Sequence, residues 1–213
     1  DGRTIGPDGT SEREFTDTVL LQRLKNSIER LNPNLSENNY DEVLRRVTRT
    51  ASNDLILDNY DFHKLLTDGV NIEQKQTDES IRTIKVRLFD FENPNNNEFL
   101  AVNQLTIVQG DTNRRPDIVL FINGLPLVVI ELKNATDSNA DLKAAYNQIQ
   151  TYKKQISGLF RFNELVVISD GLDAKIGTIT APFERFSAWK TIDGDSIITN
   201  APEFETMIRG AFS

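Results

Sequence analysis

Residues 115–134, RPDIVLFINGLPLVVIELKN, contain two apolar runs joined by Asn123-Gly124. Such a pattern predicts an antiparallel hairpin, and the near-continuous apolar character predicts strands covered on both faces. Asp117 precedes the first run, and Glu131 and Lys133 close the second. Charged groups at the ends of buried strands require a physical explanation, because isolated charges are costly in a dry environment.

The loop length of this hairpin decides where the charged side chains point. With a strict two-residue loop, Asp117 lies opposite Ile130, and Asp117 and Glu131 project to opposite faces. With a three-residue loop or a β-bulge, Asp117 faces Glu131 directly, and Lys133 shares their face because strand side chains alternate with period two.

Two opposed carboxylates repel each other, so a positive charge is expected between them. Mg²⁺ fits this position because it prefers oxygen ligands and needs only one or two carboxylates. Lys133 beside Asp117 and Glu131 then predicts hydrolysis of a phosphodiester, with the cation and the ammonium stabilising the developing negative charge.

The remaining sequence predicts helices and strands around this hairpin. The order indicates one mixed α/β layer with a mainly antiparallel sheet flanked by helices. A polar connection is expected from Asp54 to Gly69. Helices are predicted over 11–32 (with Ser11 and Glu14 as a capping box), 40–50, 139–157 and 201–212, and strands over 83–91 and 98–108 (joined by the turn NPNNN), 118–122, 125–133, 164–171 and 174–180.

Composition excludes several classes of site. The chain has no cysteine, which excludes disulfides and thiolate metal sites, and its single histidine, His63, excludes a histidine cluster. No apolar run reaches the roughly 18 residues that a membrane-spanning helix needs. We therefore expect a cytoplasmic protein without a membrane partner. The net charge of −8 does not exclude DNA, since a basic cleft can lie within an acidic shell.

Pro116-Asp117 followed by Glu131-Leu132-Lys133 resembles the signature of the PD-(D/E)xK nuclease superfamily. RRPDIVLFINGLPLVVIELKN together with AYNQIQTYK is similar to the N-terminal endonuclease region of the restriction (motor) subunit of type I restriction-modification enzymes. FERFSAWKTIDG and FETMIRGAF resemble the segment that leads towards the ATP-driven translocase of that family. The resemblance covers most of the chain from Ile81 onwards.

The resemblance implies one endonuclease domain with the PD-(D/E)xK core over 81–180. It also implies a helical part over 1–80 and, over 181–213, the start of a connection to a translocase region. It implies double-stranded DNA as substrate, Mg²⁺ as cofactor, a prokaryotic cytoplasmic setting, and specificity and methyltransferase subunits as partners. ATP would act only through the translocase, since G-x-x-x-x-G-K-[ST] is absent from these 213 residues.

The resemblance also assigns residues around Asp117, Glu131 and Lys133. The family's Q-x-x-x-Y element matches Gln148 and Tyr152, whose spacing places both on one helical face. Glu12, from the expected first helix, is a candidate third metal ligand. Candidate DNA contacts are the basic residues Arg114, Arg115, Lys153 and Lys154.

Simpler interpretations exist for each residue. Asp117 could be a turn carboxylate, Glu131 and Lys133 a solvated pair, and Tyr152 part of the core. Two other functions remain open: a RecB-like exonuclease or repair nuclease, and a non-catalytic module for DNA docking or subunit assembly.

Overall fold

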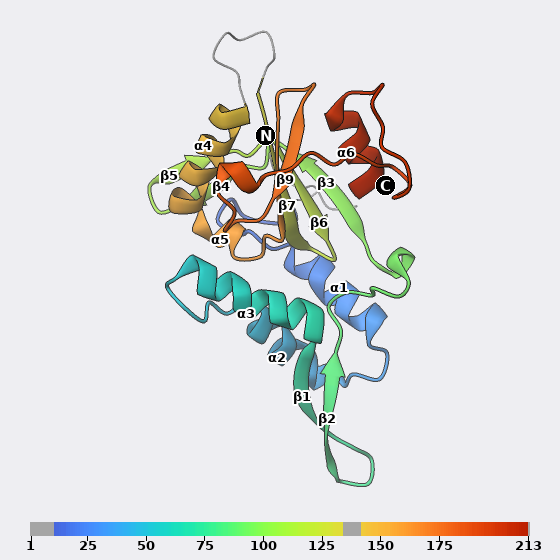
Figure 1. The fold of residues 1–213 in the computed structure, drawn as a ribbon. Helices are drawn as coiled ribbons and strands as arrows, with labels where there is room; N and C mark the ends of the chain where they lie inside the picture. Colours follow the sequence, from blue (N-terminus) through green and yellow to red (C-terminus); the bar gives the residue numbers. More distant parts are fainter. Residues whose placement is uncertain (1–10, 134–141, 213) are drawn as a thin grey trace.

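The centre of the molecule is a five-stranded sheet with the order β3-β6-β7-β8-β9 (Figure 1). The computed structural model describes residues 11–133 and 142–212. β7 and β8 pair in parallel, whereas the other neighbours pair antiparallel. The predicted mixed α/β fold with a mainly antiparallel sheet is therefore confirmed. The strands are β3 (Phe99–Asn103), β6 (Ile118–Ile122), β7 (Leu125–Leu132), β8 (Leu165–Ser169) and β9 (Ala174–Gly177).

Helices cover both faces of this sheet and create two apolar clusters. One cluster joins the sheet to α1, α2 and α3, and the other joins its opposite face to α4 and α5. No helix of the described segments is long and apolar enough to cross a membrane. The helices are α1 (Leu21–Leu31), α2 (Glu37–Thr48), α3 (Leu55–Asp68), α4 (Leu142–Gln155), α5 (Ser157–Phe160) and α6 (Glu203–Ala211), with short 3-10 turns η1 (Pro94–Asn96) and η2 (Phe183–Arg185).

The turn between β6 and β7 is a two-residue loop in which both residues have positive φ. Asn123 has φ 53° and Gly124 has φ 81°, which is the conformation that Asn-Gly turns favour in hairpins. A Cβ on Gly124 would lie 2.5 Å from the carbonyl oxygen of Leu20, so only glycine fits here. The carbonyl of Gly124 in turn accepts a hydrogen bond of 2.9 Å from the Leu20 amide, and this contact holds the hairpin against the start of α1.

A β-bulge interrupts β7 next to this turn. Phe121 pairs with Pro126, but the next residue of β6, Leu120, pairs with Val128, so Leu127 is the extra residue. Pro126 has no N–H to give to the ladder, and proline within a sheet is confined to such irregular positions. The carbonyl of Leu127 instead accepts the Glu164 amide at 2.8 Å, on the side of β8.

The bulge decides which side of the sheet the end of β7 presents. Before the bulge, the odd-numbered residues Leu125 and Leu127 face the cluster with α1–α3. Beyond it, Val128 faces that cluster and Val129 faces α4 and α5, so the odd-numbered residues now point to the opposite side. Alternation from Val129 therefore places Glu131 on the α4 side. One of the two predicted alternatives for this hairpin, a bulge that shifts the register by one, is confirmed.

The predicted first helix is wrong in its first half. α1 begins at Leu21, and the preceding residues from Ser11 form no helix but only an isolated turn, in which the Asp17 amide donates to the Glu14 carbonyl at 3.1 Å. Contacts to other elements compete successfully with the helix, because the carbonyl of Phe15 accepts from the Val108 amide at 2.9 Å. The capping box is also absent: Glu14 is exposed, and its amide donates to the Asp17 carboxylate.

Two further predictions were wrong in the region between α2 and β3. The expected polar connection after Asp54 is the helix α3, capped by the Asp54 side chain, which accepts from the amides of Ile56 and Leu57. The expected pairing of 83–91 with 98–108 does not form. β2 (Ile81–Val86) pairs instead with β1 (Val70–Lys75), and β3 joins β6. The remaining hairpin pairs β4 (Ile107–Gln109) with β5 (Thr112–Arg114).

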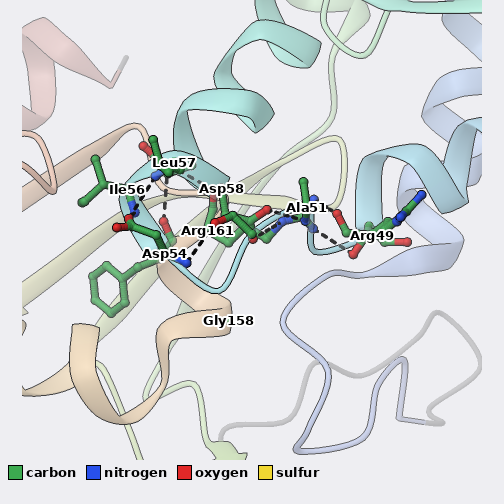
Figure 2. A network of polar contacts seen from close by, with 12 residues as sticks. Arg49, Ala51, Asp54, Ile56, Leu57, Asp58, Gly158 and Arg161 are labelled. Carbon is green, nitrogen blue, oxygen red and sulfur yellow. Dashed lines mark hydrogen bonds and ion pairs between the residues drawn. The ribbon is translucent and has the colours of Figure 1, made fainter.

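A buried ion pair ties the first turn of α3 to the end of α5 (Figure 2). Nε of Arg161 lies 2.8 Å from Oδ2 of Asp58, and both side chains are at most 7% exposed. The Arg161 guanidinium also donates to the carbonyls of Thr48 and Arg49, and Oδ1 of Asp58 accepts from the Ala51 amide at 2.8 Å. Burial lowers the pKa of Arg161, and the negative charge of Asp58 opposes that change.

Candidate active site

Three charged side chains meet where β6 begins and β7 ends. Ile118 pairs with Ile130, so the same register continued by one residue sets Asp117 opposite Glu131. Lys133 follows two residues later, and its amide still donates to the carbonyl of Ser169 on β8 at 2.8 Å. The bulge, two neighbouring strands and strand alternation together bring these side chains to the α4 side of the sheet.

Glu131 is the most buried of the three, with 3% of its surface exposed. Its Oε1 accepts a hydrogen bond of 3.1 Å from Nζ of Lys133. Its Oε2 is buried without a hydrogen-bond partner in the part of the chain that the structure describes. Burial, reinforced by the negative charge of Asp117, raises the pKa of Glu131 to about 7, although the Lys133 ammonium opposes this rise.

Asp117 is half-buried and is held by two donors. Its Oδ2 accepts from the backbone amide of Leu132 at 2.8 Å, between Glu131 and Lys133. Its Oδ1 accepts from Nε2 of Gln104 at 2.7 Å. Each carboxylate oxygen still has acceptor capacity, since an ionised carboxylate offers about four lone-pair sites.

Tyr152 on α4 lies near these carboxylates, and Gln148, one turn earlier on α4, lies beside Tyr152. Tyr152 is 5% exposed and hydrogen-bonded to Gln148. Burial and the negative charges of Glu131 and then Asp117 raise the pKa of Tyr152 to about 12, while the Gln148 hydrogen bond opposes the rise. The tyrosine is therefore a neutral phenol next to two acids. Its apolar ring also belongs to the cluster between the sheet and α4, as the simpler interpretation expected.

The four basic candidates occupy different surroundings. Arg114 ends β5 close enough to Tyr152 to lower its pKa, and its Nε donates to Gln155 at 2.5 Å. Arg115 and Lys154 are exposed. The ammonium of Lys153 is turned to the carbonyl of Ile179 at 2.5 Å, and its burial lowers its pKa. Arg115 and Lys154 are thus available to a polyanion, and Arg114 offers further N–H donors besides those given to Gln155 and to the Asn113 carbonyl, whereas the ammonium of Lys153 is turned to its own chain.

The structure does not bring Glu12 to this site, and we withdraw it as a candidate ligand. Both of its carboxylate oxygens are bound by Arg23, at 2.5 and 2.6 Å. Arg23 packs beside Gly124, at the turn of the β6–β7 hairpin. Glu131 lies at the other end of β7, roughly 20 Å away at about 3.3 Å per residue. The error follows from the helix that was expected to begin at Ser11.

The remaining carboxylates have the chemistry of a hard-cation site. Within residues 11–133 and 142–212, no group of three or more histidine, cysteine, aspartate or glutamate side chains could hold a metal ion. Mg²⁺ nevertheless needs only one or two carboxylates, because water and phosphate oxygens complete its octahedron. The unpartnered, buried Oε2 of Glu131 next to the oriented carboxylate of Asp117 fits such an ion.

Gln104 is a member of this site that the sequence did not reveal. It lies one residue beyond β3, and its contact with Asp117 depends on the pairing of β3 with β6. The sequence predicted a different partner for β3. In the observed pairing Asn103 lies opposite Ile118. Continuing this register by one residue places Gln104 opposite Asp117, and only the pairing reveals this.

The buried carboxyl of Glu131 predicts a pH-dependent stability in the absence of metal. Its pKa rises from 4.5 to about 7 on folding, so the folded state binds more protons between these values. Stability should therefore fall as pH increases from 4.5 to 7. We expect Glu131→Gln to stabilise the metal-free protein above pH 7 by up to about 3 kcal/mol, at about 1.4 kcal/mol per pKa unit.

Urea unfolding in the presence of a chelator measures this effect at pH 5 and pH 8. The difference between Glu131→Gln and wild type should grow between these two pH values. Glu205→Gln is the control, since Glu205 is an exposed acid on α6 that pairs with Arg209. A Glu131→Gln protein less stable than wild type at pH 8 would contradict the prediction.

Comparison with known proteins identifies relatives over most of the chain. The sequence model of the family "Type I restriction enzyme R protein N terminus" matches residues 2–185. The type I restriction enzyme HindI endonuclease subunit of Haemophilus influenzae is 44% identical over 181 residues, which are 84% of this chain and 17% of that protein. The putative type I restriction enzyme MjaIXP endonuclease subunit of Methanocaldococcus jannaschii is 35% identical over 197 residues, 91% of this chain and 19% of that protein. The chain thus spans less than a fifth of either relative.

Proposed function

Because the chain belongs to the family of type I restriction enzyme R proteins, whose N-terminal part it matches, we propose that it is the DNA-cleaving domain of such a subunit. In this proposal it is a Mg²⁺-dependent endonuclease with a PD-(D/E)xK core. The observation that carries the proposal is the convergence of Asp117, Glu131 and Lys133 on one face of the sheet, with one carboxylate oxygen left unpartnered.

Each residue has a distinct role in this mechanism. Asp117 and Glu131 would hold Mg²⁺, which when bound polarises the scissile phosphate and makes water more acidic. Lys133, oriented by Oε1 of Glu131, donates to the phosphate and stabilises the charge that develops on it. Tyr152 remains protonated, so its hydroxyl and the amide of Gln148 can orient the phosphate or the attacking water without adding negative charge.

DNA binding in this proposal uses the basic side chains that the fold leaves available. Arg114 lies beside the α4 end of the site, and Arg115 and Lys154 are exposed. Contacts to backbone phosphates position a duplex without reading its sequence. Target recognition would then belong to a separate specificity subunit, which with methyltransferase subunits would complete the complex.

ATP hydrolysis would belong to the translocase region of the complete subunit in the prokaryotic cytoplasm. Residues 1–80 and 81–180 would act together as one nuclease domain, because β7 packs with α1–α3 in one cluster. Residues 181–213 would begin the connection to the translocase.

Two other functions compete with this one. A RecB-like exonuclease could use the same residues but would digest DNA from its ends. A non-catalytic docking module would not need a buried carboxyl whose second oxygen lacks a partner, since an unsatisfied buried acid costs stability. Oε1 of Glu164, outside the site, is also buried without a partner among the described residues, so it is the convergence of Asp117, Glu131 and Lys133 on one face that favours a nuclease over a docking module.

The test replaces Asp117 by asparagine, which keeps the shape of the side chain and removes its charge. The complete subunit, assembled with its partner subunits, is assayed for double-strand cleavage with Mg²⁺ and ATP, and Mn²⁺ binding to the chain is measured by calorimetry. Removing a residue that only supports a metal ligand typically lowers metal affinity or activity by about 10- to 100-fold. Asp117→Asn removes a ligand itself, so Mn²⁺ affinity and DNA cleavage should each fall by at least about 100-fold.

Asp111→Asn is the matched control, because Asp111 is an exposed acid at the tip of the β4–β5 hairpin. Cleavage and Mn²⁺ affinity should remain at wild-type levels in this variant. Wild-type cleavage by Asp117→Asn would refute the proposed site, and digestion that requires DNA ends would favour the RecB-like alternative.

A further inference from the structure

Gln104 contacts Asp117 twice, with its backbone and with its side chain. Its amide donates to the carbonyl of Asp117 at 2.7 Å, and its Nε2 donates to Oδ1 at 2.7 Å. The first contact continues the pairing of β3 with β6, in which Asn103 faces Ile118. The second contact is made to the carboxylate that would hold the cation.

The backbone of Gln104 is in a conformation that side chains rarely adopt. Its φ is +52°, in the left-handed region, where a Cβ crowds the following carbonyl group. Asn123 and Glu79 are the other residues with positive φ, apart from glycines, in the described segments, and both lie in turns between strands. Strained residues of this kind persist where the surrounding structure demands them, and they cluster at functional sites.

The carboxylate of Asp117 needs an external support because Asp117 precedes the first residue of β6. The Leu132 amide supports Oδ2 from β7, and Gln104 supports Oδ1 from the β3 side. A carboxamide donates a hydrogen bond without carrying a positive charge. It can therefore fix the carboxylate while leaving the negative charge available to a cation, which a lysine or arginine at this place would neutralise.

We propose that Gln104 is a positioning residue of the metal site, whose strained backbone aims its carboxamide at Oδ1 of Asp117 and so orients the carboxylate that would hold a divalent cation. This inference rests on the proposed function, since it assumes that Asp117 is a ligand. It adds to that function a second structural support for Asp117, contributed by the residue that follows β3, a strand that contains none of the predicted catalytic residues.

The test uses two variants, Gln104→Leu and Gln104→Gly. Leucine removes the donor and keeps the bulk, whereas glycine removes the donor and also relieves the strain at positive φ. Calorimetric titration of each chain with Mn²⁺ should show affinity weakened by about 10- to 100-fold, as for other outer-sphere partners. Thermal unfolding of Gln104→Gly in a chelator should occur at or above the wild-type temperature, because glycine adopts this φ freely.

A second measurement is the Mg²⁺ dependence of cleavage by the assembled enzyme. Both variants should need more Mg²⁺ for half-maximal cleavage and should recover at saturating Mg²⁺, which a general loss of structure would not allow. Gln109→Leu is the control: Gln109 lies on β4, away from the site, and its carboxamide donates to Ser157 and accepts from the Gly158 amide of α5, both at 3.3 Å.

The outcomes distinguish the positioning role of Gln104 from the proposed nuclease function. If wild type binds Mn²⁺ and Asp117→Asn does not, while both Gln104 variants bind as wild type does, the positioning role is overturned and the proposed function stands. If wild type itself binds no Mn²⁺, both are overturned. Weaker binding by Gln104→Gly with unchanged thermal stability supports the positioning role.

Discussion

Replacing Lys133 by alanine in the complete subunit should reduce DNA cleavage by about 10² to 10⁴-fold, the range for removing a group that moves or stabilises charge in the transition state. Nζ of Lys133 is already held by Oε1 of Glu131 at 3.1 Å, and its side chain remains 28% exposed, so it can reach a phosphate. ATP-driven translocation should be unchanged, because no ATPase motif lies in these residues.

The measurement compares double-strand cleavage with translocation by the same preparation. Lys64→Ala is a matched control, since Lys64 is an exposed lysine on α3 that pairs with Asp61. Undiminished cleavage by Lys133→Ala would exclude catalysis at this site. Lys133→Arg should recover only part of the activity, because a guanidinium is larger and its donors form a rigid fork.

Asp58→Ala should have the largest effect on stability. Removing Asp58 leaves the guanidinium of Arg161 buried without its counter-charge, although the carbonyls of Thr48 and Arg49 remain (Figure 2). Breaking a buried ion pair in this way costs about 3 to 5 kcal/mol. In a domain of this size the midpoint of thermal unfolding should fall by roughly 6 to 20 °C.

Calorimetric unfolding of Asp58→Ala and of the double variant Asp58→Ala/Arg161→Leu tests the reason for this loss. The double variant should recover part of the stability, because it no longer contains an unpaired buried charge. Asp61→Ala is the control, since the exposed pair of Asp61 with Lys64 should contribute less than about 1 kcal/mol. An equal loss from Asp61→Ala would contradict the role assigned to burial.

The elements that carry the candidate site were predicted well where local sequence controls structure, and poorly where structure depends on which strands pair. The hairpin of β6 and β7, the helix α4 and the spacing of Gln148 and Tyr152 follow from periodicity and from Asn123-Gly124. Glu12 was misplaced because the helical pattern after Ser11 ignored hydrogen bonds to β4 and to the hairpin turn.

The predicted pairing of residues 83–91 with 98–108 was wrong because it also depended on contacts that local sequence does not reveal. The apolar residues of 81–86 fit a strand, but periodicity does not state which strand lies beside it. α3 was missed because its apolar residues do not form a single stripe, and three of them, Ile56, Leu57 and Tyr60, are exposed. These assignments depend on contacts between residues far apart in the sequence.

The sequence by itself determined the identities of the two acids and the lysine, the strands that carry them and the family of the chain, because these depend on residue type and short-range spacing. The tertiary structure alone decided that they meet. The extra residue Leu127 turns the end of β7 to the α4 side, and the pairing of β3 with β6 brings Gln104 to Asp117. The physical reason is that a strand has a period of two, so a single inserted residue reverses the direction of every side chain beyond it, and only long-range pairing fixes where that insertion lies.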